Sequence, residues 1–250
     1  MTPTLIKNIF TMNQQKQTLN NGTMNKRHSI LYGLLILFIT LMTTVSDVQA
    51  EKIADIESNT YKTVTIGNQV WMQDNLNISR YRNGDIIRQA KTNEEWNDAG
   101  ANGEGVWCYY NNDPAHGKKY GKLYNWYAVH DPRGLAPLGW HIPSDKEWTT
   151  ITGTLGGETV AGGKMKFNGI SQWQSPNVGG DNSSNYSALP SGMRGIDGKF
   201  SFIGESAYFW TNSEYSPTAA WYRVLNHHLA TVVRSSEEKI DGLSVRCIAD

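Results

Sequence analysis

After about residue 60, short stretches of alternating apolar and polar positions dominate the chain. The stretch YKTVTIGNQVW, residues 61–71, alternates β-branched and polar residues on both sides of a Gly-Asn pair, which predicts a β-hairpin. Further short strands, separated by turns rich in Gly, Asn and Ser, are predicted at residues 187–194, 199–203, 207–211, 220–225, 231–234 and 243–248.

Helical patterns are few and lie early in this region. Ser144 and Glu147 have the spacing of a capping box, and a buried stripe follows it at Trp148, Ile151 and Leu155 before Gly156 and Gly157 end the helix. A short helical turn is predicted at residues 93–99, and turn residues predict irregular segments at 100–121 and 168–185. The expected class is α+β, with a mostly antiparallel sheet, one or two helices and long irregular loops.

The first fifty residues form a different kind of segment. From Met24, a basic start at Lys26 and Arg27 precedes an apolar run over about residues 30–45 and the small-residue ending VQA at 48–50. This layout is typical of a secretory signal peptide cleaved after Ala50, and an uncleaved membrane anchor is the alternative. We therefore expect an N-terminal extension and signal peptide at residues 1–50, a lead-in linker at 51–60 and one domain at 61–250. After cleavage no stable membrane span is expected.

The exported part carries no basic excess. Without four cations and Asp47 of the leader, 19 of the 23 basic and 22 of the 23 acidic residues remain, a formal charge of −3. Nucleic acid is therefore not expected as a partner.

Both cysteines, Cys108 and Cys247, lie in the exported part. An oxidising compartment favours a disulfide between them, and two buried free thiols are the alternative because pairing geometry cannot be read from a sequence.

Each motif that suggests an enzyme lacks a required residue. The stretch GESAY at 204–208 has Tyr208 where a nucleophile elbow needs Gly. The stretch GETVAGGK at 157–164 has Gly163 where a phosphate-binding loop needs Lys, and no Ser or Thr follows. The histidines lack the spacing of a zinc-binding helix, and the Asn- and Asp-rich turns lack a calcium-binding register. No catalytic residue, metal or cofactor is expected.

Aromatic residues beside polar turns are the remaining candidates for a site. An exposed ring can stack on a sugar while neighbouring Asn and Asp side chains bond its hydroxyl groups, and the same combination suits a protein interface. The predicted ligand-binding set centres on the irregular region 169–186 and the closing strands, and Trp173 is expected to be more exposed than Trp221. Its members are Trp173, Asn177, Asp181, Asn182, Tyr215 and Trp221.

Several motifs carry a family resemblance. They are VTIGNQVWMQDNLN (64–77), YGKLYNWYAV (120–129), LAPLGWHIPSDKEW (135–148), FWTNSEY (209–215), AWYRVL (220–225) and GLSVRCIAD (242–250). In this order they resemble the Fibrobacter succinogenes major paralogous domain, found on exported bacterial proteins and without an established reaction. That family is similar in turn to the C-type lectin fold and, within it, to formylglycine-generating enzymes.

The chain departs from the functional branches of that fold. It has none of the E-P-N, Q-P-D or W-N-D motifs of calcium-dependent lectins, and Cys247 stands alone where the copper-binding branch has a cysteine pair. The resemblance thus implies a C-type-lectin-like domain without the calcium or copper site.

We expect a secreted, periplasmic or cell-surface binding module that is not an enzyme and whose partner is a glycan or a surface protein. An enzyme of the formylglycine-generating type or a hydrolase, and a structural envelope component, are the alternatives. Neither the ligand nor the oligomeric state can be read from the sequence.

Overall fold

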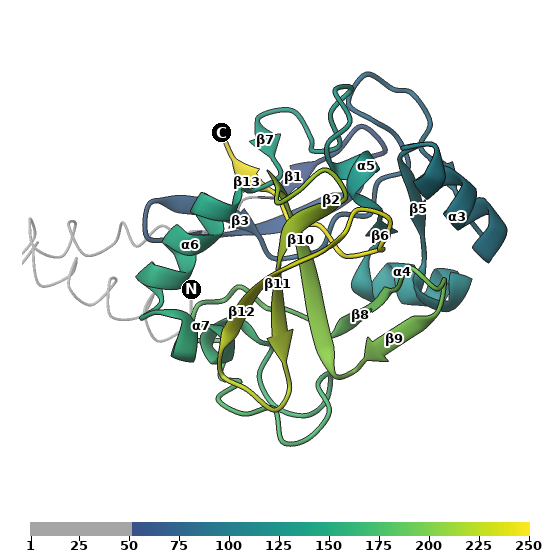
Figure 1. The fold of residues 1–250 in the computed structure, drawn as a ribbon. Helices are drawn as coiled ribbons and strands as arrows, with labels where there is room; N and C mark the ends of the chain where they lie inside the picture. The colour runs from purple at the N-terminus through teal and green to yellow at the C-terminus, as the bar shows by residue number, and fades with distance from the viewer. Residues whose placement is uncertain (1–51) are drawn as a thin grey trace, which may run out of the picture. The chain divides into compact units, whose positions relative to one another are not determined.

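The computed structural model describes residues 52–250, and the predicted leader and its cleavage site lie outside the described residues. Strands predominate over helices and form three sheets (Figure 1). The first sheet has the order β1-β2-β3-β13-β7, with β1 (Lys52–Ala54), β2 (Thr60–Ile66), β3 (Gln69–Met72), β7 (Trp140–His141) and β13 (Ile248–Ala249).

The second sheet has the order β12-β11-β10-β8-β9 and contains the longest strands. Its members are β8 (Ser191–Arg194), β9 (Phe200–Ile203), β10 (Ser206–Glu214), β11 (Ala219–Asn226) and β12 (Val232–Glu238). A small third sheet consists of β4 (Arg88–Gln89), β5 (Val106–Cys108) and β6 (Leu123–Tyr124). Most pairs are antiparallel, and β8 with β10 and β4 with β5 are parallel. The predicted α+β class with mostly antiparallel pairing is confirmed, but residues 52–250 contain five short α-helices where one or two were expected.

The helices are short and surround the second sheet. Figure 1 shows α6 and α7 on one side of β10–β12, and α3, α4 and β5 on the other side. The helices are α3 (Asn93–Ala101), the 3-10 turn η2 (Tyr110–Asn112), α4 (Pro114–Tyr120), α5 (Trp126–Val129), α6 (Asp145–Thr154) and α7 (Glu158–Met165).

Two sequence predictions of local structure are confirmed closely. The β2–β3 hairpin turns at Gly67, whose φ of 63° lies in the left-handed region that favours glycine. Helix α6 begins after Ser144, whose hydroxyl accepts a hydrogen bond from the Glu147 amide while the Glu147 carboxylate accepts one from the Ser144 amide. Both patterns depend on near neighbours in sequence, so they are visible without the fold.

Other segments differ from the sequence expectation. Residues 51–60, expected to be a lead-in, contain β1, and the expected strand at 243–248 pairs as a strand only at its end. Helix α7 was missed because its interior is held by backbone contact rather than by an apolar stripe. A Cβ on Gly162 would lie 2.5 Å from the Thr231 carbonyl oxygen, and one on Gly163 would lie 2.4 Å from that of Gly179.

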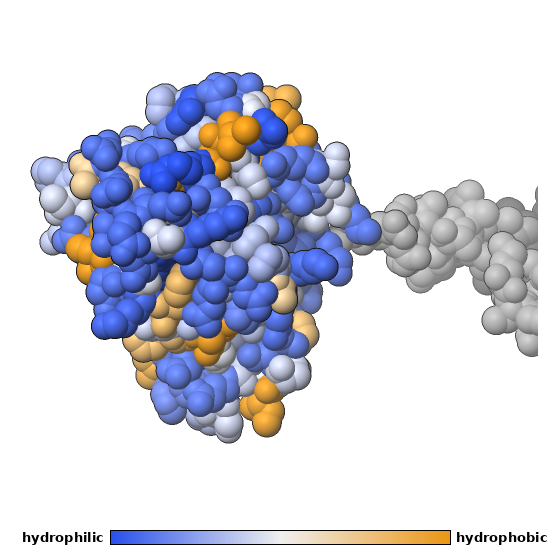
Figure 2. All heavy atoms as spheres, turned by 90° about the vertical axis from the view of Figure 1, so that its right-hand side faces the viewer, coloured by the Kyte–Doolittle hydropathy of each residue, from blue (hydrophilic) through white to orange (hydrophobic). Residues whose placement is uncertain are grey.

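Aromatic side chains fill the interior. The first cluster includes Tyr124, Trp126 and Trp210, the second Trp71, Trp148 and Phe209, and the third Trp96 and Tyr110. Phe209 and Trp210 of the closing stretch 207–250 therefore belong to the core rather than to a site. The face in Figure 2 is mainly hydrophilic, with hydrophobic atoms in small separate groups.

The predicted disulfide is wrong for this structure. Cys108 and Cys247 are both buried free thiols, and they belong to different core clusters. Burial raises the pKa of Cys108 to about 12, against an opposing effect of Arg194, and burial also raises the pKa of Cys247. Both sulfurs are thus held as protonated apolar groups, which is the alternative that sequence reasoning left open.

Candidate functional site

The irregular region predicted to present the site is closed rather than open. Trp173 is only 1% exposed, and its indole N–H donates to the Ala188 carbonyl at 3.0 Å. Asn177 is 5% exposed and its side-chain amide donates to the carbonyls of Phe167 and Gly169. Trp221 is half-buried, so the expectation that Trp173 is more exposed than Trp221 is wrong. A ring as buried as that of Trp173 cannot stack on a ligand.

A lysine explains why this loop closes. Lys166 is fully buried, and its ammonium donates to the carbonyls of Val178, Asn226 and Leu229 at 2.8–2.9 Å. Three charge-assisted hydrogen bonds to two separate segments fasten the loop onto the end of β11. We call Lys166 and residues 168–180 the closed loop.

Asp181 and Asn182 follow the closed loop and serve turns. The exposed Asp181 carboxylate accepts a hydrogen bond from the Ser183 amide, which lowers its pKa. Asn182 bonds to both the hydroxyl and the backbone amide of Ser187. Much of the hydrogen-bonding capacity of both side chains is used locally.

Tyr215 and Trp221 do lie together, but at the other end of β11. Their rings meet edge to face at a centroid distance of 4.7 Å, and the Arg234 guanidinium lies 3.4 Å from the Trp221 ring. Asp145 holds Arg234 through two hydrogen bonds of 2.8 and 3.0 Å. Because Asn226 at the far end of β11 contacts Lys166, about 16 Å of strand separates this pair from the closed loop. The predicted set therefore does not form one site.

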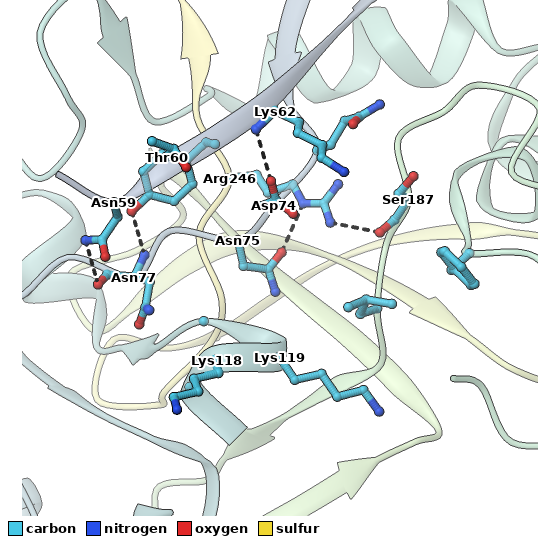
Figure 3. Close-up of a pocket in the computed structure, with 16 residues that line it drawn as sticks. Asn59, Thr60, Lys62, Asp74, Asn75, Asn77, Lys118, Lys119, Ser187 and Arg246 are labelled. Carbon is cyan, nitrogen blue, oxygen red and sulfur yellow. Dashed lines mark hydrogen bonds between the residues drawn. The ribbon is translucent and has the colours of Figure 1, made fainter. Parts of the chain in front are cut away.

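A polar pocket of about 430 Å³ opens elsewhere on the domain. It lies where the start of β2, the segment after β3, the end of α4 and the segment before β8 meet. Figure 3 shows Asn59 and Asn77 on one side, Ser187 on the other, Asp74, Asn75 and Arg246 between them, and Lys118 and Lys119 on the α4 side. The other lining residues are Thr60, Tyr61, Lys62, Gln73, Gly117, Gly121, Phe167 and Leu189.

Arg246 forms the charged floor of this pocket. It is 1% exposed, its Nε donates to Asn75 Oδ1 at 3.0 Å, and its terminal nitrogens donate to the Tyr186 and Ser187 carbonyls. The guanidinium also lies 4.2 Å from the Tyr186 ring. Burial lowers the pKa of Arg246, and no carboxylate in the described part of the chain forms an ion pair with it. The carbonyls that orient the cation are neutral, and Asp74 opposes the lowering of its pKa without forming an ion pair, so the charge is only partly compensated.

Asn75 ties the floor to the α4 wall. Its side-chain amide donates to the Tyr120 carbonyl at 2.8 Å and to the Ser244 hydroxyl at 3.3 Å. Gly121 ends α4 with a φ of 76°, and a Cβ there would lie 2.8 Å from the Leu76 carbonyl oxygen. The backbone at the end of α4 thus lies so close to the segment after β3 that a side chain at residue 121 would clash with it.

The opposite wall is anchored by a buried tyrosine. The Tyr61 hydroxyl donates to Asp55 Oδ2 at 2.6 Å and accepts from the Asn77 amide at 3.1 Å. The Asn77 carbonyl accepts from the buried Lys122 ammonium, while its side-chain Oδ1 has no hydrogen-bond partner among residues 52–250. One acceptor beside the pocket is therefore unused.

Phe167 adds an apolar surface to this polar lining. It belongs to the pocket and is 36% exposed, although it directly follows the buried Lys166. A partly exposed ring beside Asn and Ser side chains is the combination that the sequence analysis predicted at Trp173. The structure has it at Phe167 instead.

Sequence reasoning missed this pocket although the motifs contained its residues. The run QDNLN at 73–77 breaks the alternation of the hairpin, and an arginine interrupts the apolar run of GLSVRCIAD. Polar residues inside otherwise buried patterns are the signal that could have found it. The described residues contain no cluster of three or more His, Cys, Asp or Glu side chains that could hold a metal ion.

No helix of residues 52–250 is long and apolar enough to cross a membrane. Searches of curated proteins and of solved structures gave no match. The model of the Fibrobacter succinogenes major domain matches residues 64–249, a span that includes the end of β2, the pocket residues from Gln73 onward and the C-terminal strand β13. Because that match covers well over half of the chain, the protein belongs to the Fibrobacter succinogenes major domain family.

Proposed function

We propose that this domain is a non-catalytic binding module, exported to the periplasm, the cell surface or the medium, and that it binds a glycan in the polar pocket. The observation that carries the proposal is the lining itself. Amide and hydroxyl side chains held by the fold lie beside a partly exposed ring, Phe167. Ligand sites combine a few fixed polar groups with apolar surface in this way.

The rigidity of the walls supports binding without a large rearrangement. Asn75 and Arg246 are buried and mutually hydrogen-bonded, so they do not have to be ordered when a ligand enters. Side-chain amides such as those of Asn59 and Gln73 can both donate to and accept from sugar hydroxyls. Export is supported by the signal-peptide pattern, and a C-type-lectin-like fold by the sequence resemblance.

A surface protein is the second candidate partner, at a different place. Tyr215 is 56% exposed and packs against Trp221 and Arg234, residue types that are enriched at protein interfaces. The two candidates therefore predict different sensitive residues.

A glycan array with the purified protein and two variants tests the proposal. We expect at least one glycan to bind, and Phe167→Ala to weaken its binding roughly five- to hundred-fold while Trp221→Ala leaves it unchanged. A chelator should have no effect. Binding that responds to Trp221→Ala alone, or no binding to any glycan, would overturn it.

Incubation with peptide substrates separates the binding module from the enzyme alternative. We expect mass spectrometry to show no change in the mass of a cysteine-containing peptide. Turnover of that peptide would instead show that the protein is an enzyme of the formylglycine-generating type.

A further inference from the structure

The pocket has a strong imbalance of charge. Its lining includes the cations Lys62, Lys118, Lys119 and Arg246, and Asp74 is the carboxylate among its sixteen residues. The domain as a whole is slightly acidic, so this imbalance is local rather than a property of the surface in general.

Asp74 offsets the charge of Arg246 only in part. Its Oδ2 accepts a hydrogen bond from the Lys62 backbone amide at 3.0 Å, and it forms no ion pair with Arg246. An arginine this deeply buried is normally paired with a carboxylate, because burying an unpaired charge is costly. Here carbonyl oxygens and one amide bind the guanidinium directly, and Asp74 attracts it without an ion pair, so the pocket lining holds four cations and one carboxylate.

The floor also keeps donors in reserve. A guanidinium has five N–H donors, and three of those of Arg246 are used in the hydrogen bonds to Asn75, Tyr186 and Ser187. Lys118 and Lys119 lie across the space on the last turn of α4, both exposed. Neither ammonium is engaged in an ion pair within residues 52–250. An anion in the space would lie between the buried guanidinium and two exposed ammonium groups.

We infer that the pocket selects acidic glycans, meaning sugars that carry a carboxylate or a sulfate ester, over neutral glycans with the same ring and hydroxyl pattern. This inference rests on the proposed function. The hydroxyl groups of the sugar contact the Asn and Ser side chains and Phe167, while the acidic group lies toward Arg246 and the two lysines of α4. Hydrogen bonds from neutral side chains position the sugar, and the positive charge of the pocket makes acidic sugars bind more tightly than neutral ones.

Matched pairs of probes isolate the charge. One pair is trigalacturonate and its methyl ester, and the other is a sulfated dextran oligosaccharide and its unsulfated parent. Each pair shares its sugar backbone, so a difference in affinity reports the acidic group. The first pair tests a carboxylate source and the second a sulfate source.

A double variant locates the effect. Lys118→Gln with Lys119→Gln removes two pocket charges from exposed side chains, and Lys91→Gln with Lys146→Gln removes the same charge from exposed lysines outside the pocket. Circular dichroism and thermal unfolding should show both double variants folded like the unchanged protein, because each change is at the surface.

Isothermal titration at low and at physiological salt gives the decisive comparison. In at least one pair we expect the acidic member to bind at least ten-fold tighter than its neutral partner. The pocket double variant should lose roughly three- to thirty-fold of that affinity and most of its salt dependence, and the control double variant should retain both.

Equal affinity for acidic and neutral members, or equal losses in the two double variants, would overturn the selectivity for acidic sugars. A glycan array that shows binding to neutral glycans only, still sensitive to Phe167→Ala, would overturn this inference and leave the proposed function standing. Absence of any glycan binding would instead overturn the proposed function.

Discussion

The closed loop and the pocket are both irregular, polar regions with a buried cation at their base, yet one is filled and the other is open. In the closed loop the Lys166 ammonium is enclosed by three carbonyls, and Trp173 and the Asn177 amide occupy the interior. In the pocket Arg246 also donates to carbonyls, but about 430 Å³ lies in front of it.

The difference lies in what surrounds the cation rather than in residue type. The three N–H donors of the Lys166 ammonium are all used in hydrogen bonds to the segments that it joins. The planar arginine is held by Asn75 and the carbonyls of residues 186 and 187, and it still borders the open space of the pocket. Asn, Asp and Trp in a turn-rich segment therefore do not mark a site unless their polar groups are left free by the fold.

The largest expected effect is on the closed loop. Trp173→Ala should lower the free energy of unfolding by about 3–5 kcal/mol, because it removes a fully buried ring and one of the two donors to the Ala188 carbonyl, the other being the Phe167 amide. Urea denaturation measures this. Glycan binding at low temperature, where the variant is folded, should be unchanged. Lost binding with unchanged stability would restore Trp173 as a ligand residue.

Removing the cation of the closed loop should cost less. Lys166→Met should destabilise the protein by about 2–3 kcal/mol, because three carbonyls lose a charged donor while the cost of burying that charge disappears. Thermal unfolding measures the change, with Lys146→Met on exposed α6 as control. If the two methionine variants unfold alike, Lys166 does not fasten the loop.

A change at the base of the pocket should affect both stability and binding. Asn75→Ala leaves Arg246 Nε and the Tyr120 carbonyl without their partner, so we expect a loss of about 1–3 kcal/mol in the free energy of unfolding. The same change frees the guanidinium to move, so affinity for the array-selected glycan should also fall. Normal affinity in a destabilised variant would contradict the role given to Arg246.

The smallest effect is a dependence on pH that leaves the pocket untouched. Partial burial opposes the charged form of His141, but hydrogen bonds to Glu147 and Asp250, both 2.8 Å, raise its pKa overall. The folded protein thus holds this proton more tightly than the unfolded chain. The resulting stabilisation is complete below the ordinary pKa of 6.5 and is lost as the pH rises through the raised value.

We expect this term to be below about 1 kcal/mol because the ion pairs are partly exposed. Urea denaturation of the protein and of His141→Gln at pH 6 and pH 8 measures it, and the difference between the two proteins should shrink at pH 8. None of the residues lining the pocket is a histidine, so glycan affinity should stay constant from pH 6 to 7.5. If the difference in unfolding free energy between the protein and His141→Gln grows from pH 6 to pH 8, the pKa of His141 is lowered in the folded state rather than raised.

Local features of the fold were predictable from the sequence. The Gly67 turn and the capping box of Ser144 and Glu147 act within a few residues, and the alternation of residues 220–225 correctly indicated β11. Helix α7 could not be predicted in this way, since Gly162 and Gly163 are there to admit the backbone of residues 179 and 231. Only the folded chain brings those segments together.

The site was predicted far less well than the fold. Adjacent polar and aromatic residues drew attention to Trp173 and Asn177, whose partners are distant carbonyls that complete the core. The pocket instead joins Asn75 to Arg246 across 171 positions of sequence. A contact of that separation depends on the pairing of β13 with β3, which short-range patterns do not reveal.

The most direct test of the account is to map the bound glycan onto the chain. Backbone amide chemical shifts of isotope-labelled protein can be followed during titration with a glycan selected from the array. We predict that the largest changes fall in residues 59–62, 73–77 and 117–121, around the pocket, and that residues 213–223 and Arg234 stay unchanged. Changes concentrated around Tyr215 and Trp221, with none around the pocket, would contradict the assignment of the site.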